Sequence, residues 1–298
     1  MKKYFLATRP WSLPASVMPA LVTISFIFLN RTSLLQTTEI DWIAAIIALF
    51  GAAIFHLSGN LISDYFDFKH GVDSHDNIGQ TNLTIVDGII PAKTILRFGI
   101  ILMAIGVAIG LYLVTRCGLP VLYIGIAGML LTIFYFFMKA NALGDLCILL
   151  NFGILIPLGT YFCGTSVFHL PILFVTIPTG LLVVSILHAN NMRDRVNDMR
   201  AGVTSFAKII GTKGSKIYYI GMVITAYLIV IVNIIFRNLP IPALLVLLSS
   251  PIAFANIKKM ARCKEMTDIA SLDGESAKLV LVFSLLLSIG DFISPIIL

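Results

Sequence analysis

The 298-residue sequence has little charge: only 12% of its residues are Asp, Glu, Lys or Arg, while 58% are hydrophobic. A soluble domain cannot hide that much apolar surface inside one core. The mean hydropathy of +0.97 therefore excludes an ordinary soluble enzyme and predicts a protein whose solvent is the lipid bilayer.

Cysteine is scarce as well. The four cysteines, at positions 117, 147, 163 and 263, are widely separated and show neither metal-ligand nor redox spacing, so we assign them no role. The net charge of +6 is accounted for by anionic lipid together with an anionic substrate. The sequence therefore predicts no nucleic-acid partner.

Long runs of apolar residues recur along the whole sequence. An α-helix needs about 20 apolar residues to cross the hydrocarbon core of a bilayer. The runs predict an all-α polytopic membrane protein with about nine transmembrane helices, in a single domain over residues 1–298. They cover approximately 13–29, 42–62, 98–114, 119–138, 146–162, 170–187, 217–236, 241–257 and 279–298.

Positive residues set the orientation, because short cytoplasmic loops retain Lys and Arg. With a cytoplasmic N-terminus, nearly all of them fall on the cytoplasmic side, and only Arg31, Arg116 and Arg237 fall outside. An odd number of spans then leaves the C-terminus outside. Two predicted cytoplasmic segments, near 60–97 and 188–216, contain the acidic clusters of the chain.

The rare carboxylates are informative because one at membrane depth costs roughly 2.5 to 3.5 kcal/mol on insertion scales. The first cluster runs from Asn60 to Asp76 at the end of the second span, and the second runs from Asn190 to Asp198 at the end of the sixth. Four spans separate the clusters, so both fall on the same side of the membrane. We expect them to face one cavity between the helices.

The two clusters look like an internal repeat of an Asn, an Asp four residues later and another Asp one turn on. Helical spacing places Asn60, Asp64 and Asp67 on one face of a helix that continues out of the second span. The same arrangement follows the sixth span, with Asn190, Asp194 and Asp198.

An acidic loop at a membrane surface is usually solvated and has no function of its own. Either cluster, taken alone, is explained equally well in this way. Two matched clusters argue against it, because like charges one turn apart repel and indicate a compensating cation. Oxygen ligands without Cys or an obligatory His favour Mg²⁺ over zinc, and Mg²⁺ commonly binds carboxylates together with substrate phosphates. The pair therefore predicts a clamp on a diphosphate. Its predicted metal-binding and catalytic residues are Asp64, Asp67, Asp194 and Asp198.

Other polar side chains of the two segments are candidate diphosphate contacts, because they supply carboxamides and positive charge. For any one of the basic residues, the positive-inside bias explains its presence equally well. An apolar tail explains why such a site opens into a membrane, and a prenyl diphosphate has both parts. The candidates are Asn60, Lys69, Asp73, Asn190, Asn191, Arg193, Arg195 and Lys208.

On these residues, the chain resembles an intramembrane aromatic prenyltransferase of the UbiA superfamily over nearly its full length. Asp64 and Asp67 stand at the acidic positions of that family's Asn-Asp-x-x-Asp motif. Asp194 and Asp198 stand at those of its Asp-x-x-x-Asp motif. The resemblance implies helices around a central cavity, dependence on Mg²⁺, and a lateral opening through which a lipid product leaves.

Within the superfamily, the chain is most similar to the 1,4-dihydroxy-2-naphthoate polyprenyltransferases of menaquinone synthesis. Short segments carry this resemblance, at 9–14, 71–73, 144–145, 190–194 and 201–202. Two positions depart from the pattern. Ser63 stands where the family usually has Asn, for which Asn60 is a candidate substitute, and Asn77 stands where related proteins often carry Arg.

The resemblance implies transfer of a prenyl chain from a polyprenyl diphosphate to an aromatic acid, in a bacterial cytoplasmic membrane and with the active site facing the cytoplasm. Arg9 and Tyr65 are the candidate acceptor-binding residues, although a snorkelling flank residue and an interfacial anchor explain them too.

Three alternatives stay open at the level of sequence. A related enzyme with another aromatic acceptor and a terpene cyclase on the same scaffold both share the ionisation of a diphosphate. A secondary transporter is the alternative that is not an enzyme. Transporters place their ligands near the bilayer midplane, whereas the acids of this chain gather at one end of the spans, which favours an enzyme.

Overall fold

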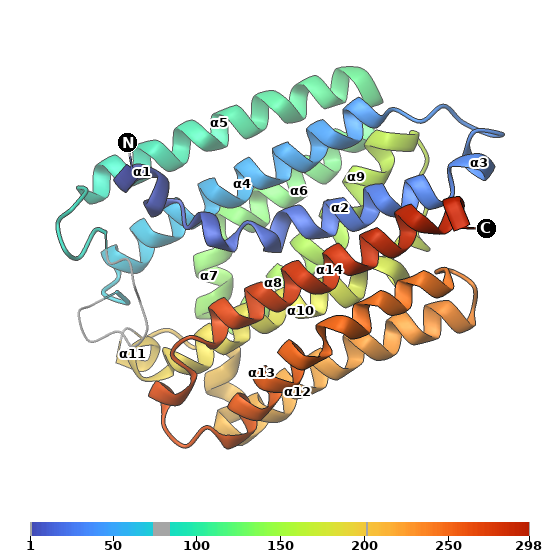
Figure 1. Cartoon of the computed structure of the whole chain (residues 1–298). Helices are drawn as coiled ribbons and strands as arrows, with labels where there is room; N and C mark the ends of the chain where they lie inside the picture. The colour runs from blue at the N-terminus through green and yellow to red at the C-terminus, as the bar shows by residue number, and fades with distance from the viewer. Residues whose placement is uncertain (1, 74–83, 201, 298) are drawn as a thin grey trace.

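The computed structural model describes residues 2–73, 84–200 and 202–297, which form one bundle of helices (Figure 1). These residues contain no β-strand, and Asn141 and Thr204 make their one isolated bridge. The apolar surface predicted from composition is therefore organised entirely as helices, as the resemblance implies.

Eight helical runs of the described chain are long and apolar enough to cross a membrane. They are η1 and α2 (Pro10–Leu29), α4 (Trp42–Lys69), α5 (Ala92–Cys117), α8 through η2 to α9 (Gly144–Thr165), α10 (Ile172–Arg193), α12 (Phe206–Ile235), η3 and α13 (Ile241–Arg262), and η4 and α14 (Met266–Ile296).

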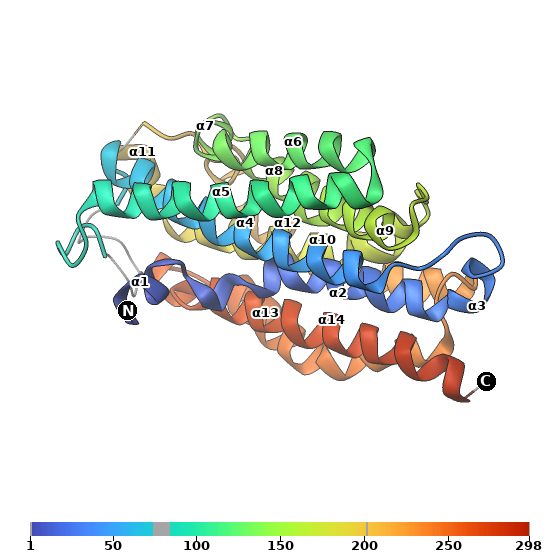
Figure 2. The same cartoon turned by 90° about the horizontal axis from the view of Figure 1, so that it is seen from above.

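The fourth predicted span is the exception. It is divided at Phe134 into α6 (Leu119–Ile133) and α7 (Tyr135–Ala140), and neither piece alone reaches spanning length. The two chain termini lie at opposite ends of the bundle (Figures 1 and 2), as an odd number of passes requires. Nine spans and a cytoplasmic N-terminus remain predictions.

The bundle has two sides joined by α2. Helices α4, α5, α6 and α9 (Ile156–Thr165) form one side, and α10, α12, α13 (Ser250–Arg262) and α14 (Leu272–Ile297) form the other (Figures 1 and 2). Helix α2 (Pro14–Leu29) packs against both α4 and α14. The cavity described below lies between these two sides.

The outer surface of the bundle is apolar, as expected of a lipid-facing surface. On α5, Ile100 and Ile101 are 54% and 56% exposed, and Ile105 is 44% exposed. A soluble monomer rarely shows such a continuous apolar face. Inside the bundle, Tyr219 and Phe283 are fully buried in the core of the C-terminal side.

The run from α8 (Gly144–Ile148) to α9 passes through the π-helical segment η2 (Leu149–Leu155). A Cβ built on Gly180 of α10 would lie only 2.7 Å from the Cα of Gly153 in η2. The two glycines therefore let the backbones touch, and η2 is pressed against α10. A π-helical turn inside a longer helix is often found at a functional site.

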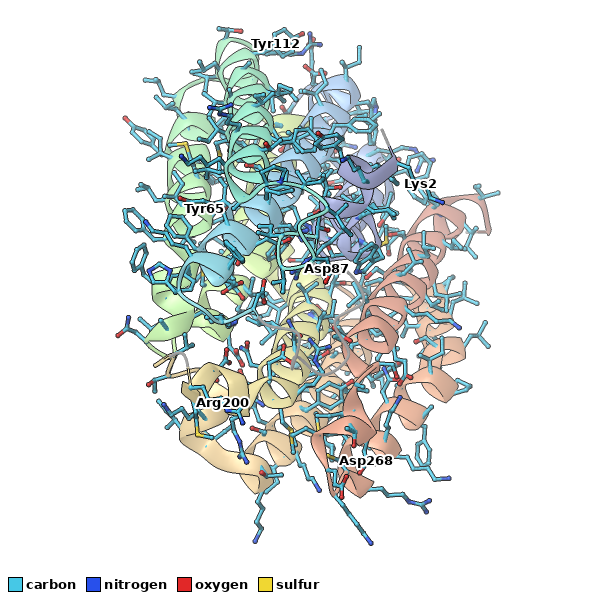
Figure 3. The ribbon with its side chains drawn as sticks, turned by 90° about the vertical axis from the view of Figure 1, so that its left-hand side faces the viewer. Lys2, Tyr65, Asp87, Tyr112, Arg200 and Asp268 are labelled. Carbon is cyan, nitrogen blue, oxygen red and sulfur yellow. The ribbon has the colours of Figure 1, made fainter. Side chains whose placement is uncertain are left out.

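One end of the bundle, which we call the acidic end, carries the short helices α1 (Lys2–Ala7), α7 and α11 (Arg195–Arg200). The opposite end carries α3 (Arg31–Leu34) and the C-terminus. Figure 3 looks onto the acidic end, where Lys2, Tyr65, Asp87, Arg200 and Asp268 come from five different segments of the chain. Both aspartate motifs end at this side.

Candidate active site

A cavity of about 630 Å³ lies between α2, α4, α6, α7, η2, α10 and α14. Its size falls within the range of about 300–1,000 Å³ that is usual for small-molecule sites. From the first motif, Asn60, Asp64 and Asp67 line it, as their helical spacing predicts. From the second, Asn190 lines it.

The first motif is held by its own helix. The Oγ of Ser63 donates a hydrogen bond to Oδ2 of Asp67 at 3.2 Å, one helical turn along α4. Ser63 stands where the family usually has Asn, so this position still supplies a polar side chain to the cavity. The hydrogen bond orients the Asp67 carboxylate and leaves its Oδ1 atom unpaired.

The N-terminal segment lies against this motif. Nη2 of Arg9 is 2.5 Å from Oδ1 of Asp64, and the Asp64 carboxylate does most to raise the pKa of Arg9. The side-chain amide of Asn60 donates to the Thr8 carbonyl and to Ser12, both at 3.0 Å. Arg9 has a φ of 54°, an uncommon conformation for a residue other than glycine, and these contacts hold it there.

The second motif is organised by a buried arginine. Arg193 donates from Nε and Nη2 to the two oxygens of Asp194, at 2.8 and 2.9 Å. It also donates to Asp273 of α14 at 2.8 Å and to the side-chain oxygen of Asn190. Since only 3% of its side chain is exposed, Arg193 is a fixed link between α10 and α14.

The second motif departs from the predicted continuous helix. Helix α10 ends at Arg193 and α11 begins at Arg195, with Asp194 at the break. The backbone N–H groups of Asp194 and Asp198 nevertheless donate to the carbonyls four residues earlier, both at 2.9 Å. The hydrogen bonding is therefore helical across the break, but the backbone of Asp194 departs from helical values, with φ at −88° and ψ at 5°.

Lys139 of α7 brings the two motifs together. Its Nζ lies 3.6 Å from Oδ1 of Asp198, whose side chain is fully buried. Burial by itself would lower the pKa of Lys139, but the charges of Asp67 and Asp198 outweigh it and raise the pKa. Burial raises the pKa of Asp198, against the opposing effect of Lys139. One lysine is thus the counterion of both motifs.

The two motifs also end in the same backbone turn. The N–H groups of Gly71 and Val72 donate to the carbonyls of Phe68 and Asp67, at 3.1 and 2.8 Å. This is a Schellman motif, with Gly71 in the left-handed region at a φ of 71°. The same pair of bonds follows Asp198, with Gly202 at a φ of 74°.

The valines after these glycines, Val72 and Val203, both pack against Phe136 of α7. The repeat that the sequence suggests is therefore a structural one. It centres on the last aspartate of each motif, and α7 lies between its two copies.

Nine of the predicted site residues do not line the cavity, and Asp73, Arg193, Asp194 and Asp198 are four of them. The other five lie elsewhere. Asn191 donates to a buried carboxylate on α8, Arg195 to a threonine of α12, and Lys208 to groups in the loop that precedes α12. Lys69 is exposed, and Tyr65 packs edge-on against its neighbour in the chain. Most of these polar groups support the framework of the site.

Asp73 lies at the end of a described stretch, and its backbone N–H donates to the Asp67 carbonyl at 3.4 Å. Asp76 and Asn77 lie outside the described residues. Asn77 therefore stays a departure from the family pattern without a structural account.

Sequence reasoning did not single out four residues that line the cavity, Lys139, Tyr135, His56 and Asn151. His56 lies within an apolar span, where an ionisable residue is a functional candidate by default, so a signal was available. Its ring nitrogens lie 3.0 Å from Ser16 Oγ and 3.3 Å from Ser12 Oγ. Lys139 follows a span and looks like an ordinary positive-inside residue.

The acidic side chains fit a divalent cation. Oδ1 of Asp67 and both carboxylate oxygens of Asp198 are buried without a hydrogen-bond partner. Such oxygens are costly unless a cation or donor satisfies them. Among the described residues, no three His, Cys, Asp or Glu side chains gather closely enough to hold one ion. The motifs therefore suit ions that complete their coordination with substrate oxygens, as Mg²⁺ often does.

The helical bundle has a cavity lined by the first aspartate motif and by Lys139, which also lies beside Asp198 of the second motif. This arrangement is typical of an intramembrane enzyme for an anionic substrate. The sequence profile of the UbiA prenyltransferase family matches residues 20–282, and the chain belongs to this family. It is therefore an enzyme of the prenyltransferase class, and the transporter alternative is excluded.

Individual proteins agree with this placement. UbiA prenyltransferase domain-containing protein 1 of Gallus gallus is 32% identical over 301 residues, which cover 98% of this chain and 85% of that protein. The protein of the same name from Homo sapiens is 30% identical over 298 residues, with 98% and 84% covered. These names identify no acceptor.

Solved structures share the fold. The apo structure of a UbiA homolog from Aeropyrum pernix K1 has a TM-score of 0.67 at 17% identity, covering 94% of this chain and 95% of that one. A UbiA homolog from Archaeoglobus fulgidus, bound to GPP and Mg²⁺, has a TM-score of 0.61 at 14% identity, covering 96% and 99%.

Proposed function

We propose that this enzyme transfers the prenyl group of an allylic polyprenyl diphosphate to an aromatic acid, with 1,4-dihydroxy-2-naphthoate as the acceptor. The observation that carries the proposal is the meeting of Asp67 and Asp198 around Lys139 beside one cavity. Support for the donor comes from the archaeal homolog described with GPP and Mg²⁺. Support for the acceptor comes from the segments at 9–14 and 71–73, which resemble the naphthoate subgroup.

In this proposal Asp64, Asp67, Asp194 and Asp198 bind Mg²⁺. The bound metal would supply positive charge that stabilises the diphosphate as it leaves. The unpaired buried oxygens of Asp67 and Asp198 support the assignment, because they have capacity for ligands that the protein itself does not use.

Three basic side chains have different roles in the proposed mechanism, two of them at the diphosphate and one at the second motif. Lys139 lines the cavity and makes only a long contact to Asp198, so its ammonium is able to meet a phosphate oxygen. Arg193 is committed to Asp194 and Asp273 and acts by positioning the second motif. Arg9 is proposed to stabilise the diphosphate beside Asp64, a role that replaces its predicted contact with the acceptor carboxylate.

These charges promote ionisation of the C1–O bond of the donor, which leaves an allylic cation and diphosphate. The rings of Tyr135 and Phe152 line the cavity, where an aromatic face stabilises a cation by about 0.5–2 kcal/mol. The electron-rich acceptor ring then attacks C1. Aromaticity is restored by loss of a proton when C1 bonds to a ring carbon that carries hydrogen. When it bonds to the carbon that carries the carboxylate of a naphthoate, carbon dioxide leaves in place of the proton.

Neutral polar groups are proposed to hold the acceptor. His56, Ser12 and Asn151 line the same cavity and carry no permanent charge. Hydrogen bonding by such groups suits the hydroxyls of a hydroquinone-like ring. The proposed membrane orientation places this site on the cytoplasmic side. The named relatives above are animal proteins, so they lend no support to a bacterial membrane.

The test uses the purified full-length chain in lipid nanodiscs with Mg²⁺, a labelled prenyl diphosphate and a panel of aromatic acids. Prenylated 1,4-dihydroxynaphthalene is the expected product, and Asp64→Ala and Asp194→Ala should each abolish its formation. Glu39→Gln, at an exposed site on the opposite end of the bundle, is the control that should keep wild-type turnover. A cyclic hydrocarbon formed without acceptor, or normal turnover in either aspartate variant, would overturn the proposal.

A further inference from the structure

Two of the four cysteines meet at the end of the bundle opposite the acidic end. Cys117 is the last residue of α5, and Cys163 lies in α9, 46 positions further along the chain. Both helices end on the side of the bundle that carries α3 (Figure 1). The Cys117 thiol donates to the Cys163 carbonyl, with Sγ and O 3.6 Å apart, and a side-chain hydrogen bond also joins the two thiols. Helix packing creates this pair, so spacing in the sequence gives no sign of it.

Asp41 holds the backbone beside both cysteines. Its carboxylate accepts a hydrogen bond from Arg116, the neighbour of Cys117, with Nη2 and Oδ1 3.1 Å apart. Its backbone N–H donates to the carbonyl of Gly164, the neighbour of Cys163, at 2.8 Å. These contacts keep the two cysteines together without any bond between their sulfurs.

The two thiols differ in exposure. Cys163 is 2% exposed and packs in an apolar cluster with Ala44 and Leu113, whereas Cys117 is half-buried beside this cluster. A small oxidant therefore reaches Cys117 first. The Cys163 thiol is placed to attack a sulfur that is bound to Cys117, which is the role of a resolving cysteine.

We propose that Cys117 and Cys163 are a disulfide site, which a small disulfide oxidant closes by thiol–disulfide exchange, and that the bond fastens α5 to α9. The predicted orientation places this end of the bundle outside the cytoplasm, where disulfides form and persist. The site lies away from the aspartates, so the inference does not depend on the proposed function.

The exchange has two steps. The Cys117 thiolate attacks one sulfur of the oxidant, whose own disulfide breaks and releases a first thiolate. The Cys163 thiolate then attacks Sγ of Cys117 in the mixed disulfide and releases the second. One S–S bond forms for each one that breaks. Two electrons pass to the oxidant, and the two protons lost by the cysteines convert its thiolates into thiols.

The other two cysteines provide matched controls. Cys147 donates to the Leu131 carbonyl and Cys263 to the Glu265 carbonyl, with sulfur-to-oxygen distances of 3.5 and 3.2 Å. Both are buried, and they lie on α8 and in the turn after α13. Serine at either position should therefore leave the Cys117 and Cys163 pair intact.

The test counts free thiols in the purified full-length chain in lipid nanodiscs. The reduced protein is exposed to oxidised glutathione, denatured, and labelled with a maleimide for mass spectrometry. Four labels are expected before oxidation and two after it, with Cys117 and Cys163 joined in one pair of peptides after digestion. Cys147→Ser and Cys263→Ser should each still lose two labels.

Variants of the pair separate the two steps. Cys163→Ser leaves Cys117 without its resolving thiol, so we expect it to retain one glutathione as a mixed disulfide. Cys117→Ser should keep its three remaining thiols free, because Cys163 is protected by burial.

Thermal unfolding is the second readout. A disulfide restricts the unfolded chain between its two ends, so the oxidised wild type should unfold several degrees above the reduced protein. Cys117→Ser is expected to fold, since the residue is half-buried at a helix end. It should unfold at the same temperature with and without oxidant.

Four free thiols after oxidation, or glutathione on both cysteines of the wild type without a link between them, would overturn the proposal. A bond that includes Cys147 or Cys263 would do the same, as would equal unfolding temperatures for the oxidised and reduced wild type. None of these measurements uses a donor or an acceptor, so failure of the proposed function is recorded separately.

Discussion

Lys139 shows how much of this active site depends on a single side chain. It is 12% exposed, lines the cavity and lies 3.6 Å from Asp198, while the Asp67 charge also raises its pKa. Its ammonium interacts with a carboxylate of each motif. In the proposed function it helps to stabilise the departing diphosphate.

We expect Lys139→Met to lower kcat by about 10- to 100-fold, because a hydrogen bond to a charged group contributes about 1.5–3 kcal/mol. Lys208→Met is the matched control, since Lys208 lies outside the cavity and donates to groups in the loop that precedes α12. Steady-state rates at saturating donor give the measurement, with thermal unfolding recorded for both variants. Equal kcat values for the two variants would remove Lys139 from the mechanism.

At the scale of single elements, α4 is anchored at the end opposite the motif. Asp41 is its N-cap and accepts a hydrogen bond from the Ala44 N–H at 3.0 Å. The same carboxylate pairs with Arg116 near the end of α5, with Nη2 to Oδ1 at 3.1 Å. One residue therefore both starts α4 and attaches it to α5.

Two substitutions at Asp41 separate these roles. Asp41→Ala loses the cap and the ion pair, and the cap alone is worth about 1 kcal/mol, whereas Asp41→Asn keeps a capping side chain. We expect Ala to lower the unfolding temperature more than Asn does. Thermal unfolding in detergent at pH 7 measures both, and equal losses would show that the cap contributes nothing.

The same pair makes a prediction about pH. The hydrogen bond from Arg116 lowers the pKa of Asp41 in the folded protein. Its stabilisation is therefore present above the ordinary carboxyl pKa of about 4 and is lost as the pH falls through the lower folded value. Wild type should lose more stability than Asp41→Asn in that acidic window, and parallel acid titrations of the two proteins would contradict this.

At the scale of the whole molecule, the cavity lies between two sides of the bundle that each provide one motif. The first comes from α4, and the second comes from α10 and α11. Arg193 already links α10 to α14, but the contact between the motifs themselves depends on one lysine. A ligand that binds both motifs should therefore stabilise the entire bundle.

We expect Mg²⁺ together with inorganic diphosphate to raise the unfolding temperature by several degrees, since a ligand at 100 times its Kd stabilises by about 2.7 kcal/mol. The double variant Asp64→Asn/Asp194→Asn should lose this increase, and Glu39→Gln should keep it. Differential scanning fluorimetry in nanodiscs measures the shift. The same shift in the double variant would show that the ions bind elsewhere.

Local patterns determined what the sequence predicts correctly. Apolar runs predict the helices because a span must satisfy its backbone hydrogen bonds internally, and spacings of three and four place Asn60, Asp64 and Asp67 on one face of α4. These features depend on neighbouring residues alone, so they are readable without a partner. The prediction of a continuous helix through Asp198 is wrong, because the chain turns at Asp194, where Arg193 holds the carboxylate against α14 through Asp273.

The sequence by itself determined the membrane solvent, the helical class, the two aspartate motifs and membership of the UbiA prenyltransferase family. Only the tertiary structure decided that Lys139 joins the motifs, that Arg9 pairs with Asp64, and that Lys69, Arg195 and Lys208 stay outside the cavity. The reason is physical. A single helix places the charged residues that are close to a motif in sequence, and local spacing predicts where they lie. The packing of several helices places the residues that are close to it only in space. The glycines that permit this packing carry no chemical group that would mark them in the sequence.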